Sequence, residues 1–290
     1  MRGRRPTSAA LLAATLLIAG PALAQAPVKV LENAGFDGPE SARHDPVRDE
    51  YLVTSTGPRG PESNGFVSRV SPDGNVIAAK WIEGGRNGVT LTDPFGIFIA
   101  GERIYVADVK AVHVFDRLSG APFRSIPIPD AVRLNDLFVT ANGTIYVTDS
   151  GSDDSPGALY RIDAAGKVSE FVKRDPVLER PNGIAVLADG TVVHGGRGVN
   201  LSFRSPAGRL LREVTLPFGR FDGIVPLADG SLLVSSQDGH GVYHLPANGK
   251  PVMVVKDIPV PAAIGFDIKR SRILIPQIRA ATLTIVEYKP

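Results

Sequence analysis

The sequence predicts an all-β protein, a six-bladed β-propeller made of four-stranded antiparallel blades. Six strand-like segments open at a nearly constant spacing, at Glu40, Phe95, Asn135, Asn182, Asp222 and Ala262. The intervals between them are 55, 40, 47, 40 and 40 residues. A repeat near 40 residues with several short strands per unit is typical of a propeller. Short turns recur between the strands, and Asn-Gly and Asp-Gly pairs favour hairpins because glycine readily adopts positive φ.

The third repeat shows the strand pattern most clearly. Residues 136–140, 144–148, 158–162 and 167–172 alternate between apolar and polar side chains or are rich in β-branched and aromatic residues, as expected of strands. Asn142-Gly143 and Ala165-Gly166 supply the turns, and the longer polar segment Ser150–Gly157 separates the second strand from the third. We therefore expect four strands in each repeat.

The last repeat has only three strand-like segments after Ala262, near 264–267, 272–276 and 282–287. A further strand-like segment, Val28 to Asn33, precedes the first repeat. Pairing it with the last repeat would complete the sixth blade and close the ring, which would remove exposed strand edges. The sequence therefore predicts that the N-terminal strand completes the last blade.

Residues 1–24 have the features of a secretory signal peptide, and residues 25–290 form the predicted propeller domain. Three arginines precede an apolar run from Ala9 to Ala19, and Ala22-Leu23-Ala24 resembles a cleavage site before Gln25. We expect a periplasmic or secreted protein without stable membrane insertion after cleavage. An uncleaved anchor is the alternative.

Charge and cysteine content exclude several classes of protein. Without Arg2, Arg4 and Arg5, 29 basic residues remain against 30 acidic ones, and the chain has no basic runs that would indicate nucleic-acid binding. The sequence has no cysteine, which excludes disulfides, thiolate metal sites and cysteine nucleophiles.

Four of the six openings carry oxygen-bearing side chains that a propeller would bring to one mouth of its central channel. Carboxylate and amide oxygens suit a hard divalent cation, above all calcium. We therefore expect a metal site with Glu40, Asn182 and Asp222 as ligands and Asn135 bound directly or through water. The absence of histidine from this set disfavours zinc, although zinc or manganese would also fit.

Each of these residues has a purely local interpretation as well. Asn-Gly and Asp-Gly at strand starts often serve only turn hydrogen bonds. The shared position of all four polar residues in the repeat, with apolar residues at the other two, favours a common site.

The motifs around these residues resemble the senescence marker protein/gluconolactonase/luciferin-regenerating enzyme family of six-bladed propellers. The resemblance spans residues 25–290 and rests on Glu40 five residues before Asp45, on Asn135-Asp136 with Arg133 before it, on Pro181-Asn182-Gly183, and on Asp222-Gly223. The first motif departs from the family's common Glu-Gly-Pro-x-Trp, since it reads Glu40-Ser41-Ala42-Arg43-His44. The resemblance implies one central divalent cation and hydrolysis of a lactone or ester.

Two functions of different class follow from this site. In the first, a metal-dependent lactonase or esterase uses Asp222 as ligand and general base, while Arg133 and Asn135 orient the substrate or stabilise the oxyanion. His240, in a loop at the same mouth, is the next candidate for an acid or base. In the second, a non-catalytic module binds a ligand on the propeller face through loops such as Thr56–Gly65, and the metal is structural. The sequence specifies neither the substrate nor the oligomeric state.

Overall fold

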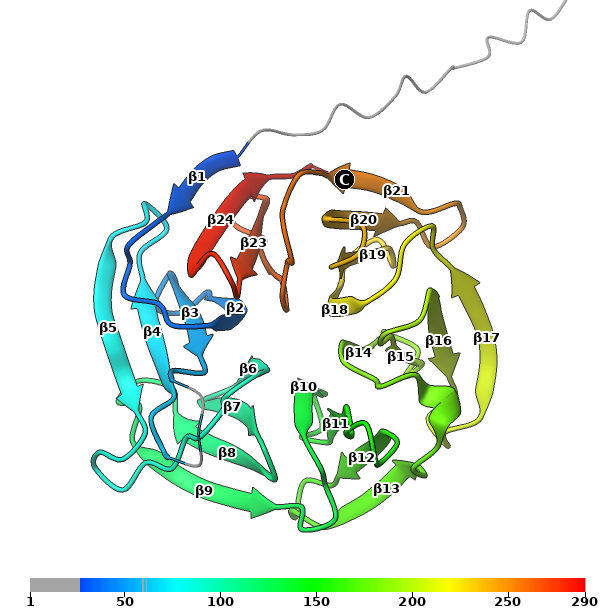
Figure 1. The fold of residues 1–290 in the computed structure, drawn as a ribbon, viewed down its shortest axis with the longest axis horizontal. Helices are drawn as coiled ribbons and strands as arrows, with labels where there is room; N and C mark the ends of the chain where they lie inside the picture. Colours follow the sequence, from blue (N-terminus) through cyan, green and yellow to red (C-terminus); the bar gives the residue numbers. More distant parts are fainter. Residues whose placement is uncertain (1–26, 59, 61, 290) are drawn as a thin grey trace, which may run out of the picture.

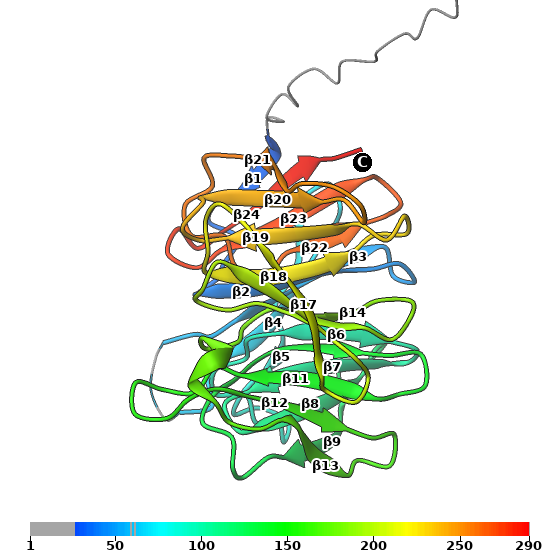
Figure 2. The ribbon, with the colours of Figure 1, turned by 90° about the vertical axis from the view of Figure 1, so that its right-hand side faces the viewer.

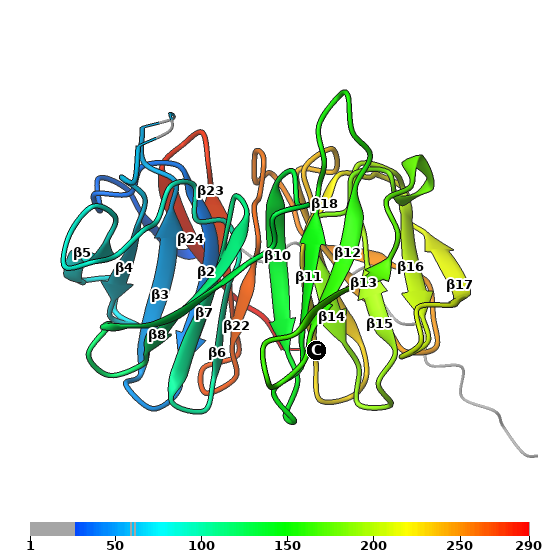
Figure 3. The same cartoon turned by 90° about the horizontal axis from the view of Figure 1, so that it is seen from below.

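Short strands separated by glycine-containing turns fold into six sheets arranged around a central axis. The computed structural model describes residues 27–58, 60 and 62–289. Six four-stranded sheets surround the axis, with the first strand of each repeat innermost (Figure 1). Seen from two perpendicular sides, the strands run between the two faces of a disc (Figure 2, Figure 3). The predicted six-bladed β-propeller is confirmed.

Each blade takes its strands in sequence order, and the sixth takes one strand from the start of the chain. The first blade contains β2 (Pro39–Asp45), β3 (Glu50–Ser55), β4 (Phe66–Val70) and β5 (Val76–Glu83). The second contains β6 (Ile97–Ala100), β7 (Arg103–Asp108), β8 (Ala111–Asp116) and β9 (Pro122–Pro127). The third contains β10 (Leu134–Val139), β11 (Ile145–Asp149), β12 (Ala158–Ile162) and β13 (Val168–Val172).

The remaining blades follow the same order. The fourth contains β14 (Ile184–Val186), β15 (Val192–His194), β16 (Asn200–Arg204) and β17 (Leu210–Thr215). The fifth contains β18 (Phe221–Pro226), β19 (Leu232–Ser236), β20 (Gly241–Leu245) and β21 (Val252–Val255). The sixth contains β22 (Gly265–Asp267), β23 (Arg272–Gln277), β24 (Thr282–Glu287) and β1 (Pro27–Leu31). A 3₁₀ turn, η1 (Pro176–Leu178), interrupts the link between the third and fourth blades.

The ring is closed by two sets of contacts, as the strand count predicted. At the outer edge, β1 pairs antiparallel with β24, and Leu31 lies opposite Leu283 (Figure 1). At the axis, the amide of Ala263 donates to the carbonyl of Glu40 at 2.9 Å, and the amide of Ala42 donates to the carbonyl of Ala263 at 3.2 Å. The last blade is therefore joined to the start of the chain at both its outer and its inner edge.

Buried hydroxyl groups join neighbouring blades beside the axis. Thr148 Oγ1 accepts from the amide of Asp136 in its own blade at 3.0 Å and donates to the carbonyl of Asn182 in the next blade at 2.6 Å. Thr54 and Ser235 form equivalent bridges, to the carbonyls of Phe95 and Ala262. The second strands of the first, third and fifth blades thus carry the same bridging hydroxyl group. In each case the hydroxyl donates to the carbonyl of the residue that opens the next blade.

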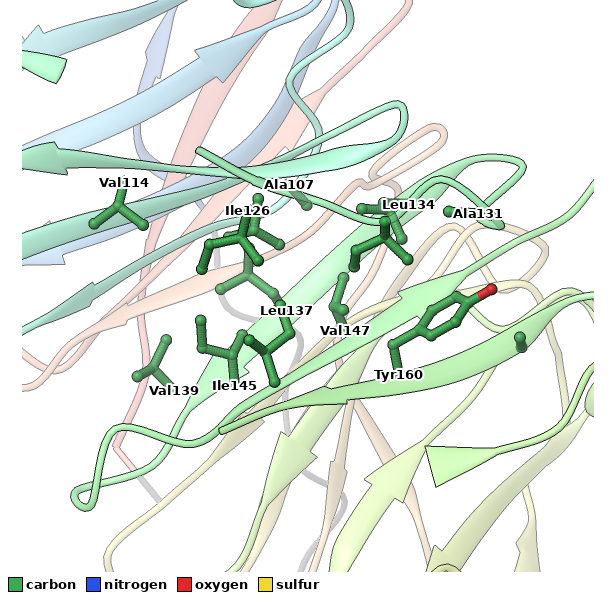
Figure 4. Close-up of a cluster of buried hydrophobic side chains, with 14 residues drawn as sticks. Ala107, Val114, Ile126, Ala131, Leu134, Leu137, Val139, Ile145, Val147 and Tyr160 are labelled. Atoms are coloured by element: carbon green, nitrogen blue, oxygen red, sulfur yellow. The ribbon is translucent and has the colours of Figure 1, made fainter. Parts of the chain in front are cut away.

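Apolar side chains fill the spaces between adjacent blades. Between the second and third blades, Ile126 and Val114 pack with Leu137, Ile145 and other buried residues (Figure 4). Leu137 and Ile145 are completely buried, and each such side chain stabilises the fold by about 1.5–3 kcal/mol through removal of apolar surface from water. The blades therefore pack face to face through apolar side chains that are buried between them.

The expectations for the first residues lie outside the described part of the chain. The signal peptide at residues 1–24 and its cleavage before Gln25 both fall there. In the residues that the structure describes, no helix has the length and apolar character needed to cross a membrane.

Removing the closing strand should destabilise the propeller. A chain beginning at Ala34 lacks β1, so it loses the burial of Leu31, which is 4% exposed, and leaves the edge of β24 unpaired. We expect a loss of about 2–3 kcal/mol in the free energy of unfolding and a Tm lower by roughly 5–10 °C. Thermal denaturation against a control chain beginning at Ala26 measures this. Equal melting temperatures would show that the inner contacts alone close the ring.

Candidate metal and substrate site at the channel mouth

A polar pocket lies at one mouth of the central channel, where the innermost strands begin. Its cavity volume is about 260 Å³. Residues from the third, fourth, fifth and sixth blades and from the start of β2 line it, namely Glu40, Arg133, Asn135, Ser150, Gly151, Arg180, Asn182, Gly196, Arg197, Arg220, Phe221, Asp222, Gln237, Val260, Ile278 and Arg279. All four expected metal ligands and Arg133 belong to this set.

The four oxygen-bearing residues reach the pocket from four different blades. Glu40 lies in β2, Asn135 in β10 and Asp222 in β18, while Asn182 lies two residues before β14. Asp222 is 2% exposed, and Glu40 and Asn135 are each 9% exposed. The repeat therefore brings together residues that are separated by up to 182 positions in the sequence, as the register predicted. Their role as metal ligands stays a prediction.

Close packing of the innermost strands explains the glycine that follows Asn182 and Asp222. A Cβ atom on Gly183 would lie 2.2 Å from the carbonyl oxygen of Asp222, and one on Gly223 would lie 2.3 Å from the amide of Ile264. Neither contact involves a side chain that could move away. The Asn-Gly and Asp-Gly pairs therefore serve strand contact at the axis, and the preceding polar side chain extends into the pocket.

Neighbouring polar groups orient the amide and carboxylate side chains. Gln237 Nε2 donates to Asp222 Oδ2 at 2.7 Å, and Asn135 Nδ2 donates to Ser150 Oγ at 3.1 Å. Ser150 Oγ in turn donates to the carbonyl of Pro181 at 2.7 Å. Because the amide nitrogen of Asn135 is engaged in this way, its Oδ1 is the atom available to a ligand.

Three buried acceptor oxygens at the site have no hydrogen-bond partner among the described residues. They are Oδ1 of Asn182, Oδ1 of Asp222 and Oδ2 of Asp136. Leaving a buried polar atom unpaired costs about 1–3 kcal/mol, so such a cluster calls for an explanation. A bound hard cation would satisfy acceptor oxygens of this kind.

Arg43 and Asp136 form a buried pair next to this cluster. Arg43 Nη2 lies 3.5 Å from Asp136 Oδ1, and the two side chains are 14% and 0% exposed. Arg43 Nη1 also donates to the carbonyl of Ile264 at 2.6 Å. The guanidinium is thus fixed between the first and sixth blades and offsets part of the negative charge of Asp136.

Burial shifts the pKa values of both aspartates upward. Desolvation raises the pKa of Asp136 to about 6, and the charge of Arg43 acts in the opposite direction. Desolvation and the nearby charge of Asp136 raise the pKa of Asp222 to about 7, against hydrogen bonds from Gln237 and Asn182 that lower it. A cation beside these groups would favour their charged forms and lower both pKa values.

The donor set fits calcium better than zinc. Among the residues that the structure describes, no three histidine, cysteine, aspartate or glutamate side chains are grouped so that they could hold a metal ion. Any cation here would depend on the amide oxygens of Asn135 and Asn182 together with two carboxylates. Such a set of hard oxygen donors suits calcium, whereas zinc usually takes imidazole or thiolate ligands.

Of the other residues and loops expected at the site, some line the pocket and some do not. Arg133 lines the pocket, and its guanidinium lies over the ring of Phe95 at 4.7 Å from the centroid. His240 is exposed and is not among the described residues that line the pocket, so the geometry does not favour it as an acid or base. The loop Ser150–Gly157 contributes Ser150 and Gly151 to the pocket. Thr56, from Thr56–Gly65, lines an adjoining hollow.

Sequence reasoning missed most of the arginines around the pocket. Arg180, Arg197, Arg220 and Arg279 line it in addition to Arg133. The repeat could have identified two of them. Arg180 and Arg220 occupy the same repeat position as Arg133, two residues before the residue that opens the blade. Arg197 and Arg279 lie in loops after β15 and β23, where no repeat position identifies them.

Fold and site together define a six-bladed β-propeller with a polar pocket on its central axis. The chain belongs to the SMP-30/Gluconolactonase/LRE-like family, whose model matches residues 63–266. The match includes Asn135, Asn182 and Asp222 but begins after Glu40. A search of curated protein sequences finds no match.

Several solved structures share the fold at low sequence identity. A calcium-binding protein, regucalcin, from Agrobacterium tumefaciens has a TM-score of 0.67 and 15% identity over 92% of this chain and 95% of its own. A gluconolactonase from Xanthomonas campestris has a TM-score of 0.65 and 18% identity over 94% and 99%. Virginiamycin B lyase from Staphylococcus aureus has a TM-score of 0.63 and 15% identity over 90% and 99%. At these identities the likeness concerns the fold.

Replacing Arg43 by methionine should destabilise the protein in a pH-dependent way. The change leaves Asp136 buried without its cationic partner, which costs about 3–5 kcal/mol, and raises the pKa of Asp136 further. When folding raises the pKa of a carboxyl group, the free energy of unfolding falls as pH rises from the unfolded-state pKa, about 4, to the folded-state pKa. The wild-type carboxyl already loses this stability between about pH 4 and its own folded pKa of about 6. The deficit in Tm relative to the wild type should therefore be nearly constant below about pH 6 and grow above it, toward the higher pKa of the variant.

The double variant Arg43→Met/Asp136→Asn is the control for this measurement. It removes the titrating carboxyl, so its melting temperature should vary less with pH than that of Arg43→Met between pH 4 and 7. If both variants showed the same pH-independent deficit, Arg43 would act through packing and not through the charge of Asp136.

Proposed function

We propose that this chain is a divalent-metal-dependent hydrolase of a lactone or related ester, with its site at the channel mouth. Membership of a family that includes gluconolactonases supports the reaction class. The observation that carries the proposal is that two of the pocket-lining residues, Asn182 and Asp222, each have a buried acceptor oxygen without a hydrogen-bond partner among the described residues. Glu40, Asn182 and Asp222 would hold the cation, calcium by preference, with Asn135 bound directly or through water.

The residues of the pocket have separate tasks in this reaction. When bound, the cation would supply polarisation of the ester carbonyl and acidify a water molecule. Asp222 accepts the proton of the attacking water and returns it to the leaving alkoxide as the acyl C–O bond breaks, which yields a hydroxy acid. Gln237 holds Asp222 Oδ2 and so fixes the carboxylate. Arg133 orients the substrate and donates to the developing oxyanion, while Asn135 presents Oδ1 to the cation or to a donor group of the substrate.

The alternative is a non-catalytic module with a structural cation. A structural ion is enclosed by protein atoms, whereas a catalytic one needs an open coordination position and a path to it. Here a pocket of about 260 Å³ adjoins the candidate ligands, which favours the enzyme. Fold alone does not decide between the two functions. A panel of lactones and simple esters, assayed with and without a chelator after metal analysis of the purified protein, tests the proposal directly.

Two substitutions separate the role of a base from that of a ligand. Asp222→Asn keeps an oxygen but removes the base, so activity should fall by about 10²–10⁴-fold even at saturating metal. Asn182→Ala removes a neutral ligand and keeps both carboxylates, so excess metal should restore part of the rate. Hydrolysis rate against metal concentration measures both effects. Equal rescue of the two variants would show that Asp222 is only a ligand.

We also propose export to the periplasm or the medium, directed by residues 1–24. The support is the arginine-rich start, the apolar run and the Ala-x-Ala sequence before Gln25. The exported protein should therefore begin at Gln25 when its N-terminus is sequenced. Retention of Met1 would point to an anchor or to a protein that is not exported.

A further inference from the structure

Arginine side chains dominate the charge of the central pocket. Five arginines line it, while Glu40 and Asp222 are the acidic residues among its described lining. The full chain has 32 basic and 30 acidic residues and a formal charge of +2, so this excess is local. Positive charge is therefore concentrated around one cavity of about 260 Å³.

The repeat itself holds three of these arginines at the pocket. Arg133, Arg180 and Arg220 each precede an opening residue of a blade by two positions. Arg180 and Arg220 have φ angles of 57° and 53°, a left-handed conformation that costs roughly 1 kcal/mol or more for a residue with a Cβ atom. Glycine would adopt this conformation without strain, yet both positions at the edge of the pocket carry arginine.

The guanidinium groups are only weakly neutralised by other side chains. Arg180 Nη1 lies 3.1 Å from Asp153, whose side chain is 90% exposed. Arg220 Nη1 lies 3.7 Å from Asp238, and both side chains are about half exposed. Exposed pairs of this kind contribute little. Arg197 and Arg279 form no ion pair with any described residue and are exposed.

Five cations around a small pocket repel one another, and an oxyanion would relieve that repulsion. Guanidinium groups bind phosphate and carboxylate through paired, charge-assisted hydrogen bonds. Three guanidinium groups remain in excess after Glu40 and Asp222 are counted, and a bound divalent cation would raise the positive charge further. A neutral sugar lactone would leave these groups unused.

We infer that the pocket takes an anionic substrate, an acidic sugar lactone or ester bearing a phosphate or carboxylate group that the rim arginines bind. The reaction in this statement rests on the proposed hydrolase function. The recognition of an oxyanion rests on the arginines alone. Arg197 and Arg279, which lack ion-pair partners among the described residues, would be specificity-determining residues for the charged group.

Binding of stable hydroxy acids tests the inference without turnover. The probes are 6-phosphogluconate, which carries a phosphate, glucarate, which carries a second carboxylate, and gluconate and neutral glucitol as comparisons. We expect calorimetric titration to show at least tenfold tighter binding of 6-phosphogluconate or glucarate, each with a second anionic group, than of gluconate, and weaker binding at high salt because screening reduces these attractions. Tighter binding of 6-phosphogluconate than of glucarate would indicate a site for phosphate, and the reverse order would indicate a site for carboxylate.

The double variant Arg197→Gln/Arg279→Gln should weaken binding of the preferred probe by about tenfold or more. Its matched control is Arg209→Gln, an exposed arginine in the turn between β16 and β17 at the opposite face, which should bind as the wild type does. Both substitutions affect exposed side chains, and unchanged melting temperatures would verify the fold. A double variant that binds every probe like the wild type would overturn the inference.

The two proposals fail in distinguishable ways. Arginine-dependent binding of an acidic probe without hydrolysis of any lactone or ester would refute the proposed reaction and retain the anion site. Equal hydrolysis of glucono-1,5-lactone and its 6-phospho and 6-carboxy counterparts, unaffected by Arg197→Gln/Arg279→Gln, would retain the hydrolase and refute the anionic substrate.

Discussion

The hydroxyl groups of Thr54, Thr148 and Ser235 fix the main chain from which the central site is built. Each accepts from an amide in its own blade and donates to the opening carbonyl of the next blade. Without such a hydroxyl, two buried main-chain groups would lose their partners, each at a cost of about 1–3 kcal/mol. Side chains that project from a backbone held in this way have little freedom, so the oxygens at the channel mouth are preorganised for a ligand.

Charge is arranged in layers along the axis. Arg43 lies buried beside Asp136, the carboxylates of Asp222 and Glu40 line the pocket, and the arginines form its edge. Each layer offsets part of the charge of its neighbour, which lets the propeller keep ionisable groups near its centre. Burial nevertheless raises the pKa values of Asp136 and Asp222, and a cation beside them would favour their charged forms.

The sequence predicted the features that depend on the repeat. The strand pattern between Asp136 and Val172, the closure by the N-terminal strand and the meeting of Glu40, Asn135, Asn182 and Asp222 all follow from periodicity, because strands at one register must share one position on the axis. Arg197 and Arg279 were not singled out, although the strand order places the loops Arg197–Asn200 and Gln277–Ala280 at the mouth, because position in a loop does not fix which side chain enters the pocket. The Arg43–Asp136 pair escaped because it links the first and third blades, and no local pattern reveals a contact across the channel.

Closure by β1 also dictates the order in which the molecule can fold. Leu31 and Leu283 come from opposite ends of the described chain, so the contact between them has a very large sequence separation. Hairpins within a blade can form early, whereas bringing the ends together carries the full loop-closure entropy and belongs to a late, slow step. Until β24 has been synthesised, β1 has no partner strand and its edge is available to other chains. A chain of this design therefore depends on protection from association during synthesis more than the closed ring suggests.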